Sequence, residues 1–248
     1  GMKLNEMIQK GEVTKDKCKI GYVGAFPYAE VISGFTSFYL GVKSVCDSAT
    51  MEVKYTNSWA SFDLEKECAE QLIADGCVLI SQHADTTGAP TACEAKKVPC
   101  VGYNIDMIPT APDAALTSAT INWGPYYTYA VQSVIEGTAI DTDWSKGVKD
   151  GADAITELND KTVAKGTKEK VEEAQKGIED GTIHVFDTSK FTVGGKTLEE
   201  LVESGDEDAT KLQSYIKDGY FHESDVESGM PSAPAFTFII DGINSITK

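Results

Sequence analysis

Positive charge is scarce in this sequence, and long apolar runs are missing. Lysine and arginine together number 22 against 39 acidic residues, which leaves a formal net charge of −17 over 248 residues. Binding to nucleic acid or to anionic lipid needs a basic surface, and none is present. No run approaches the roughly 20 apolar residues that cross a bilayer, and no signal peptide opens the chain. The sequence therefore argues against nucleic acid and membrane surfaces as partners, and the acidity is explained most simply by solubility.

The cysteines lack the Cys-x-x-Cys spacing that is typical of zinc ribbons and thioredoxin-type redox sites. Six of them stand at positions 18, 46, 68, 77, 93 and 100, all in the first half of the chain. An even number is compatible with disulfides in an oxidising compartment. Cys68, Cys77 and Cys93 instead fall where helix faces and strand starts place small buried residues. We expect mostly free, buried thiols, and the disulfide alternative stays open.

Motifs for catalysis are also missing. The chain has only three histidines and no Gly-x-Ser-x-Gly elbow, and it has no Walker-type lysine loop. The segment 21–24 lacks the third glycine of a dinucleotide fingerprint, and 222–225 has the wrong spacing for a zinc helix. His83 with Asp85 is the one suggestive pair, which can fix its own loop or contact a ligand. We therefore expect no enzyme activity, no cofactor and no metal site.

What the sequence does contain is a regular alternation of strands and helices from residue 18 onward. Apolar strand patterns alternate with helical spacing over ten to eighteen residues, as in a parallel sheet with helices on both faces. The predicted elements are strands at 19–24, 51–56, 77–81 and 99–103 and helices at 28–45, 63–75 and 88–96. The fold class is therefore α/β, with a Rossmann-like parallel sheet flanked by helices.

After residue 106 the pattern is less regular. We predict strands at 116–121, 154–158, 182–186 and 235–240, a Gly-Gly hairpin at 191–197, and helices at 125–136, 167–179, 198–204 and 208–218. This reading divides the chain into an amino-terminal helix remnant (1–17), a ligand-binding lobe with a crossover segment (18–160) and an acidic carboxyl-terminal extension (161–248). No internal repeat is present.

Polar or aromatic side chains follow the strands predicted at 51–56, 77–81, 99–103 and 116–121. They are Asn57 and Trp59, then Gln82, His83 and Asp85, then Asn104 and Asp106, and finally Trp123. The carboxyl ends of parallel strands meet at one edge of a sheet, where small ligands bind in open α/β folds. A tryptophan in a polar loop can stack on a planar ligand, and a carboxylate can accept from a ribose or a base. The alternatives remain that Trp59 covers its own helix, that Asp106 fixes its loop and that Trp123 staples a helix.

Several sequence motifs that occur in a fixed order are more specific for a family than any one of these residues. The strings Ile20-Gly21-Tyr22-Val23-Gly24-Ala25, Thr56-Asn57-Ser58-Trp59, Gln82-His83-Ala84-Asp85, Gly102-Tyr103-Asn104-Ile105-Asp106-Met107 and Asn122-Trp123-Gly124-Pro125-Tyr126-Tyr127 resemble the basic membrane protein family over roughly residues 3–160. That family comprises substrate-binding lipoproteins of ABC importers that bind purine nucleosides or bases. The resemblance implies a type I periplasmic-binding-protein fold of two lobes. It also implies a Trp59 that stacks on the base and an Asp106 that binds sugar or base, with Gln82, His83, Asp85, Asn104 and Trp123 at the same mouth.

One departure from the family matters. The resemblance places a whole amino-terminal lobe before the helix at 3–9, and here that lobe is missing, so we expect a second lobe with a carboxyl-terminal part. The intact protein is then expected to be an extracytoplasmic, lipid-anchored partner of an ABC permease. The helix at 125–136 would expose an apolar face, which predicts a homodimer of this chain. Two other readings remain, a ligand-sensing regulatory domain of the same fold and a small enzyme.

Overall fold

The protein is built around a seven-stranded sheet. A computed structural model describes residues 1–246, and its strand order is β6-β5-β4-β3-β1-β2-β9. Neighbouring strands are parallel except β6, which pairs antiparallel with β5. The strands are β1 Lys19–Gly24, β2 Thr50–Tyr55, β3 Leu79–His83, β4 Cys100–Tyr103, β5 Ala115–Ile121, β6 Asp153–Ile155 and β9 Ile243–Ile246. This confirms the predicted α/β class, and the run β2-β1-β3-β4-β5 is a doubly wound order.

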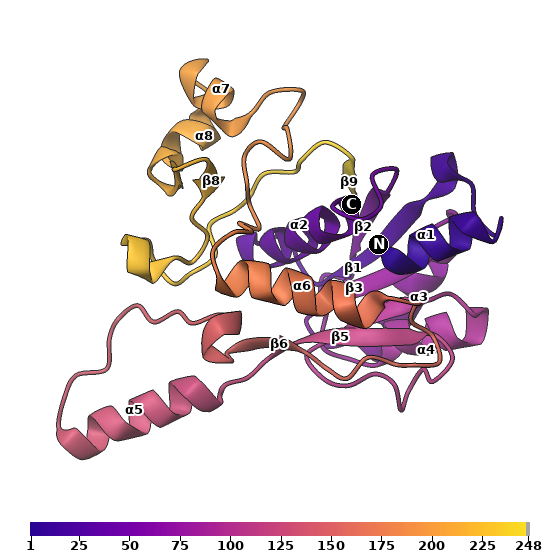
Figure 1. The fold of residues 1–248 in the computed structure, drawn as a ribbon, viewed down its shortest axis with the longest axis horizontal. Coiled ribbons are helices and arrows are strands. Elements are labelled where there is room, and N and C mark those ends of the chain that lie inside the picture. Colours follow the sequence, from indigo (N-terminus) through magenta and orange to yellow (C-terminus); the bar gives the residue numbers. More distant parts are fainter. Residues whose placement is uncertain (247–248) are drawn as a thin grey trace.

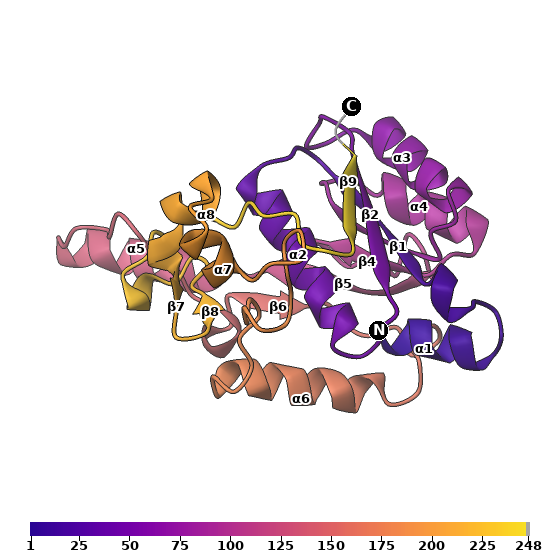
Figure 2. The ribbon, with the colours of Figure 1, turned by 90° about the horizontal axis from the view of Figure 1, so that it is seen from above.

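Helices cover both faces of the sheet. The first helix of the chain, α1 (Met2–Gln9), and α2 (Ala29–Lys43) lie on one face, and α3 (Phe62–Ala74) and α4 (Gly88–Lys96) lie on the other (Figure 2). The strand β1 shows why: Ile20 and Tyr22 belong to the core against α2, whereas Val23 belongs to the core against α3 and α4. Alternate side chains of a strand point to opposite faces, so a strand apolar on both faces is buried on both.

Two further helices lie outside this sandwich. One of them, α6 (Thr167–Glu179), runs along the α1 and α2 side, and α5 (Gly124–Glu136) projects away from the sheet beyond β5 and β6 (Figures 1 and 2). The short helices α7 (Leu198–Glu203) and α8 (Glu207–Lys211) sit in a carboxyl-terminal cap with the hairpin β7 (Ile216–Lys217) and β8 (Tyr220–Phe221). The Gly-Gly hairpin predicted at 191–197 is reduced to one bridge between Val193 and Lys196.

The predicted boundaries shift where polar residues continue a strand. The third strand runs Leu79–His83 instead of 77–81, because Ser81, Gln82 and His83 all stay buried and aligned with β1. The short strand predicted at 154–158 is β6 at 153–155.

The strand predicted at 182–186 is wrong. The backbone N–H groups of Thr182 and Ile183 both donate to the carbonyl of Gly177, which closes the end of α6 with a turn. The chain then carries Phe186 into an aromatic group with Phe236, at a ring separation of 4.5 Å. Capping of the helix therefore uses the donors that a sheet would have needed.

The helix predicted at 208–218 is also wrong beyond Lys211. Asp218 and Gly219 both have positive φ values, 55° and 84°, and they join β7 to β8. An Asp-Gly pair between two short strands is a strong signal for a two-residue hairpin turn, which the helical spacing obscured.

The segment 235–240, predicted as the last strand, is buried but does not form a strand. Phe236, Phe238 and Ile240 are buried, yet the segment pairs with no strand among the described residues. The N–H groups of Ala235 and Phe236 donate to one carboxylate oxygen of Glu223, each at 3.0 Å. The strand that does join the sheet, β9, comes a few residues later and pairs with β2.

Within residues 1–246 no disulfide forms and all six cysteines are buried, as the sequence predicts. The carboxyl-terminal cap shares its core with the sheet, because Phe221 and Phe236 belong to the same apolar cluster as Leu4 and Ile20. The division at residues 17 and 160 stays a prediction.

Candidate functional site

The carboxyl edge of the sheet gathers aromatic side chains at the ends of β1 and β2. Trp59, in the loop after β2, lies 5.6 Å from the ring of Phe26 and 6.3 Å from that of Tyr28. Phe26 and Tyr28 follow β1 and stack on each other at 5.0 Å. Trp59 is half-buried and touches the core, whereas Tyr28 is 54% exposed. These three side chains are here called the aromatic cluster. They meet because they follow β1 and β2, which are adjacent strands of the sheet.

Hydrogen bonds hold the loop of Trp59 against the loop after β3. The N–H of Asp85 donates to the carbonyl of Trp59 at 2.8 Å. Glu65, fully buried on α3, accepts from the N–H of Ser61 at 3.2 Å and from that of Thr86 at 3.1 Å. Burial raises the pKa of Glu65, and these hydrogen bonds oppose the rise. Trp59 and Asp85 are therefore brought together, as the sequence predicts, by a carboxylate that sequence reasoning did not single out.

His83 ends β3 beside the aromatic cluster and is 8% exposed. Its ring lies 4.5 Å from that of Tyr103, and its Nε2 is 3.8 Å from a carboxylate oxygen of Glu30 in the first turn of α2. That distance suits an ion pair and is too long for a hydrogen bond. Burial, with the charges of Glu30 and Asp85, raises the pKa of Tyr103 to about 12, so its phenol stays neutral and able to donate. The acidic partner facing His83 is therefore Glu30, which the sequence analysis missed, rather than Asp85.

Gln82 has a structural role that the sequence analysis did not foresee. Its amide Nε2 donates to the carbonyls of Ala84 and Thr86, at 2.7 and 3.0 Å. Both amide hydrogens are thus used to shape the turn after β3, so Gln82 has only its side-chain oxygen left to offer a ligand.

Asn57, Asn104 and Asp106 fix their own loops. Asn57 and Asn104 adopt left-handed backbone conformations with φ values of 57° and 69°. Asparagine tolerates this region better than most residues. An oxygen of Asp106 accepts the N–H of Ile108 at 2.9 Å, the loop-fixing alternative noted above. Its side chain is exposed, and the second carboxylate oxygen can still accept from a ligand.

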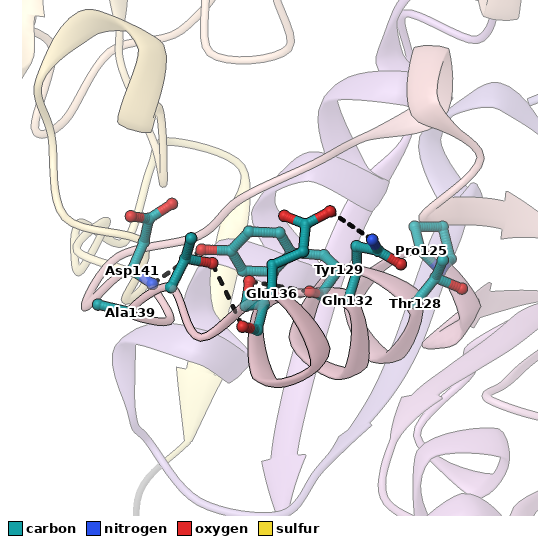
Figure 3. Close-up of a pocket in the computed structure, with 9 residues that line it drawn as sticks. Pro125, Thr128, Tyr129, Gln132, Glu136, Ala139 and Asp141 are labelled. Carbon is teal, nitrogen blue, oxygen red and sulfur yellow. Dashed lines mark hydrogen bonds between the residues drawn. The ribbon is translucent and has the colours of Figure 1, made fainter.

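Trp123 lies apart from the aromatic cluster, in a group on α5. It precedes α5, is 54% exposed and contacts the rings of Tyr126 and Tyr127. A hollow of about 540 Å³ lies between α5 and its return loop, lined by Tyr129, Gln132 and Glu136 among others (Figure 3). A second, apolar hollow lies along the same helix. Neither includes a residue predicted to bind ligand, and both are formed by one helix and the loop that follows it.

The side chains at the carboxyl edge are of the kinds that bind a flat ligand. Aromatic faces at β1 and β2 can stack on a flat ring, and the polar groups at β3 and β4 can bond its edge. Within residues 1–246, no three histidine, cysteine or acidic side chains gather closely enough to hold a metal ion. No helix in the same range is long and apolar enough to cross a membrane.

Sequence comparison identifies relatives of this chain among transport proteins. Residues 12–187 match the family described as ABC transporter substrate-binding protein PnrA-like. A purine-binding protein of Brucella abortus is 32% identical over 67% of this chain and 47% of its own length. A protein of Haloferax volcanii named as an ABC transporter glucose-binding protein is 31% identical over 73% of this chain and 46% of its own length. The chain thus spans about half the length of these relatives.

The fold of solved solute-binding proteins matches as well. A solute-binding protein of an ABC transporter system from Aeropyrum pernix has a TM-score of 0.58 at 17% identity, over 84% of this chain and 67% of that protein. The mostly parallel sheet with helices on both faces is therefore a periplasmic-binding-protein-like architecture. Because the family match extends over well more than half of the residues, the chain belongs to the PnrA-like family of ABC transporter substrate-binding proteins.

Proposed function

We propose that this chain binds a purine nucleoside or purine base at the carboxyl edge of its sheet, as the solute-binding component of an ABC importer. The observation that carries the proposal is the aromatic cluster, in which Trp59 adjoins Phe26 and Tyr28. A flat base gains by stacking on such rings, and polar groups that follow β3 and β4 can bond its edge or its sugar. The purine-binding relative from Brucella abortus supports the same class of ligand.

The intact protein would work outside the cytoplasm, anchored by lipid and delivering its solute to a permease. Membership of a family of ABC transporter substrate-binding proteins supports this setting. In this setting Trp59, His83, Asp85, Asn104 and Asp106 would supply one side of the ligand site. Gln82 shapes its loop through its side-chain amide and Asn57 through its left-handed backbone, whereas Trp123 packs on Tyr126 and Tyr127.

We also propose that two copies of the chain meet through α5. Four apolar side chains of this helix are more than half exposed, namely Tyr127, Val131, Val134 and Ile135. They recur at helical spacing, so they form one face. The helix has one carboxylate and no lysine in a chain of net charge −17, so two copies can meet there with the least electrostatic repulsion.

The ligand is tested by calorimetric titration of the chain with adenosine, guanosine, inosine, adenine and glucose. We expect a purine to bind more tightly than glucose. Replacing Trp59 by alanine should weaken purine binding by about 1–3 kcal/mol, the usual value of a base stacked on an aromatic ring. The control is Trp144→Ala, since Trp144 packs on Tyr126 and Tyr129 beside α5. Tighter binding of glucose, or equal purine affinity in Trp59→Ala, would contradict the proposal.

A further inference from the structure

We propose that Glu30 and His83 together recognise one hydrogen-donating group of the solute, a hydroxyl or an amino group, at the junction between β1 and β3. This inference rests on the proposed function and names two side chains that fix which solutes fit.

The pair occupies the switch point of the sheet. Chain order reverses between β1 and β3, because β2 lies on one side of β1 and β3 on the other. Ligands of doubly wound sheets bind in the crevice outside such a point. Glu30 follows β1 at the start of α2, and His83 is the last residue of β3, so the two reach the crevice from both sides.

The packing of α2 leaves space for the imidazole of His83. Gly34 of α2 faces the ring so closely that a Cβ there would stand 2.5 Å from Nδ1 and 2.9 Å from Cε1. The ring of Tyr103 covers it at 4.5 Å. A glycine in the middle of a helix is less favourable than alanine, and here its lack of a side chain makes room for the imidazole.

The Nε2 atom of His83 lacks a hydrogen bond. It is buried, and within residues 1–246 no donor or acceptor reaches it at hydrogen-bond distance. Glu30 is half-exposed, and its carboxylate oxygen stays 3.8 Å from Nε2. An unpaired buried polar atom is unfavourable, so a solute atom that bonds to it recovers this loss.

The charge at this position selects the solute group. The contact with His83 lowers the pKa of Glu30, so the carboxylate is ionised at neutral pH and only accepts hydrogen bonds. The solute group must therefore carry a hydrogen. Two atoms 3.8 Å apart can both lie at hydrogen-bond distance from a third atom placed beside them. A ribose hydroxyl and the amino group of adenine both satisfy this requirement.

The test compares three ligands on the full chain by calorimetry: adenosine, adenine, which lacks the ribose, and purine riboside, which lacks the amino group. The variants are Glu30→Gln, His83→Phe and His83→Gln, and the control is His184→Gln, because His184 stacks on Tyr220 in the carboxyl-terminal cap. We expect Glu30→Gln and His83→Phe to weaken adenosine binding about tenfold or more, as for loss of a hydrogen bond to a charged or buried group. His83→Gln, which keeps a polar atom near Nε2, should retain part of the affinity, and the control should bind as the wild type does.

The comparison of the three ligands then identifies which solute group is recognised. If the ribose is bound, the effect of Glu30→Gln disappears with adenine; if the amino group is bound, it disappears with purine riboside. Equal losses for all three ligands would show that the substitutions act through the fold, and unchanged affinity in both variants would show that the pair does not meet the solute. Either result overturns this inference alone. Failure of the wild type to bind any purine overturns the proposed function and this inference with it.

Discussion

Glu65 positions the candidate site without reaching it. Its two carboxylate oxygens accept the N–H groups of Ser61 and Thr86, which ties α3 to the loop that carries Asp85. Replacing Glu65 by alanine removes the acceptor of two partly buried donors, so the free energy of unfolding should fall by about 1–3 kcal/mol. Glu67→Ala, an exposed position on the same helix, should change it by less than about 0.5 kcal/mol. Urea unfolding of both variants measures the difference; equal values would show that Glu65 does not hold the loop.

The pH dependence of stability gives a second view of Glu65. Burial raises its folded-state pKa above the ordinary value of 4.5, so the folded chain holds the proton more tightly than the unfolded chain. This contribution to stability is complete below pH 4.5 and is lost as the pH rises through the folded-state pKa. The stability of the wild type relative to Glu65→Gln should therefore fall as the pH increases above about 4.5. Denaturant unfolding at a series of pH values measures it, and a rising or flat difference would contradict the assigned burial effect.

At the scale of an element, α2 contains two glycines with opposite expected effects. A Cβ at Gly34 would meet the imidazole of His83, whereas one at Gly41 would meet nothing within 4 Å. Gly41→Ala should therefore raise the free energy of unfolding by about 0.5–1 kcal/mol through helix propensity. Gly34→Ala should lower it by about 1–3 kcal/mol through overpacking and should weaken purine binding.

Thermal unfolding and calorimetric titration of the two variants provide the comparison. The contact at Gly34 involves a side chain at the binding edge, so Gly34→Ala should lose more purine affinity than Gly41→Ala. Equal stabilisation by both alanines would mean that the imidazole moves aside without cost.

The elements differ in how far the sequence alone predicts them. The strands β1 to β5 and helices α1 to α6 follow from apolar periodicity, and all of them except α5 and α6 are buried by neighbours close along the chain. The carboxyl-terminal segments depend on single groups instead. Glu223 satisfies the backbone near Phe236, and Asp218 with Gly219 turns a predicted helix into a hairpin. Side-chain to backbone bonds of this kind replace regular pairing and leave no periodic signal.

The candidate site, too, can be predicted from the sequence only in part. The placement of Trp59 and Asp85 at one sheet edge could be predicted, because polar residues after parallel strands meet there. The pairing of Glu30 with His83 could not be predicted, because it requires β3 to lie next to β1. Local sequence patterns do not determine the order of the strands in a sheet. Phe26 and Tyr28 were missed for the same reason. Asp106 could cap its loop or bind a ligand, and the structure shows the first role without removing the second.

At the scale of the whole molecule, α5 presents an exposed apolar face within residues 1–246. It projects from the sheet with Val134 and Ile135 about three-quarters exposed, at 71% and 73% (Figure 1). Apolar surface of this kind favours association, so sedimentation should show a monomer–dimer equilibrium. Val134→Glu should shift it toward monomer, because each dimer would then bury like charges. Ile178→Glu, at an exposed site on α6, should leave it unchanged. A wild type that stays monomeric at high concentration would contradict dimerisation through α5.

The central claim is that a purine stacks on the aromatic cluster at the carboxyl edge of the sheet. A crystal structure of the full chain grown with adenosine tests it most directly. We predict the base in van der Waals contact with the ring of Trp59, with a polar group of the ligand turned toward His83 and Glu30. Adenosine seated along α5, with the rings of Trp59, Phe26 and Tyr28 free of ligand, would contradict the account.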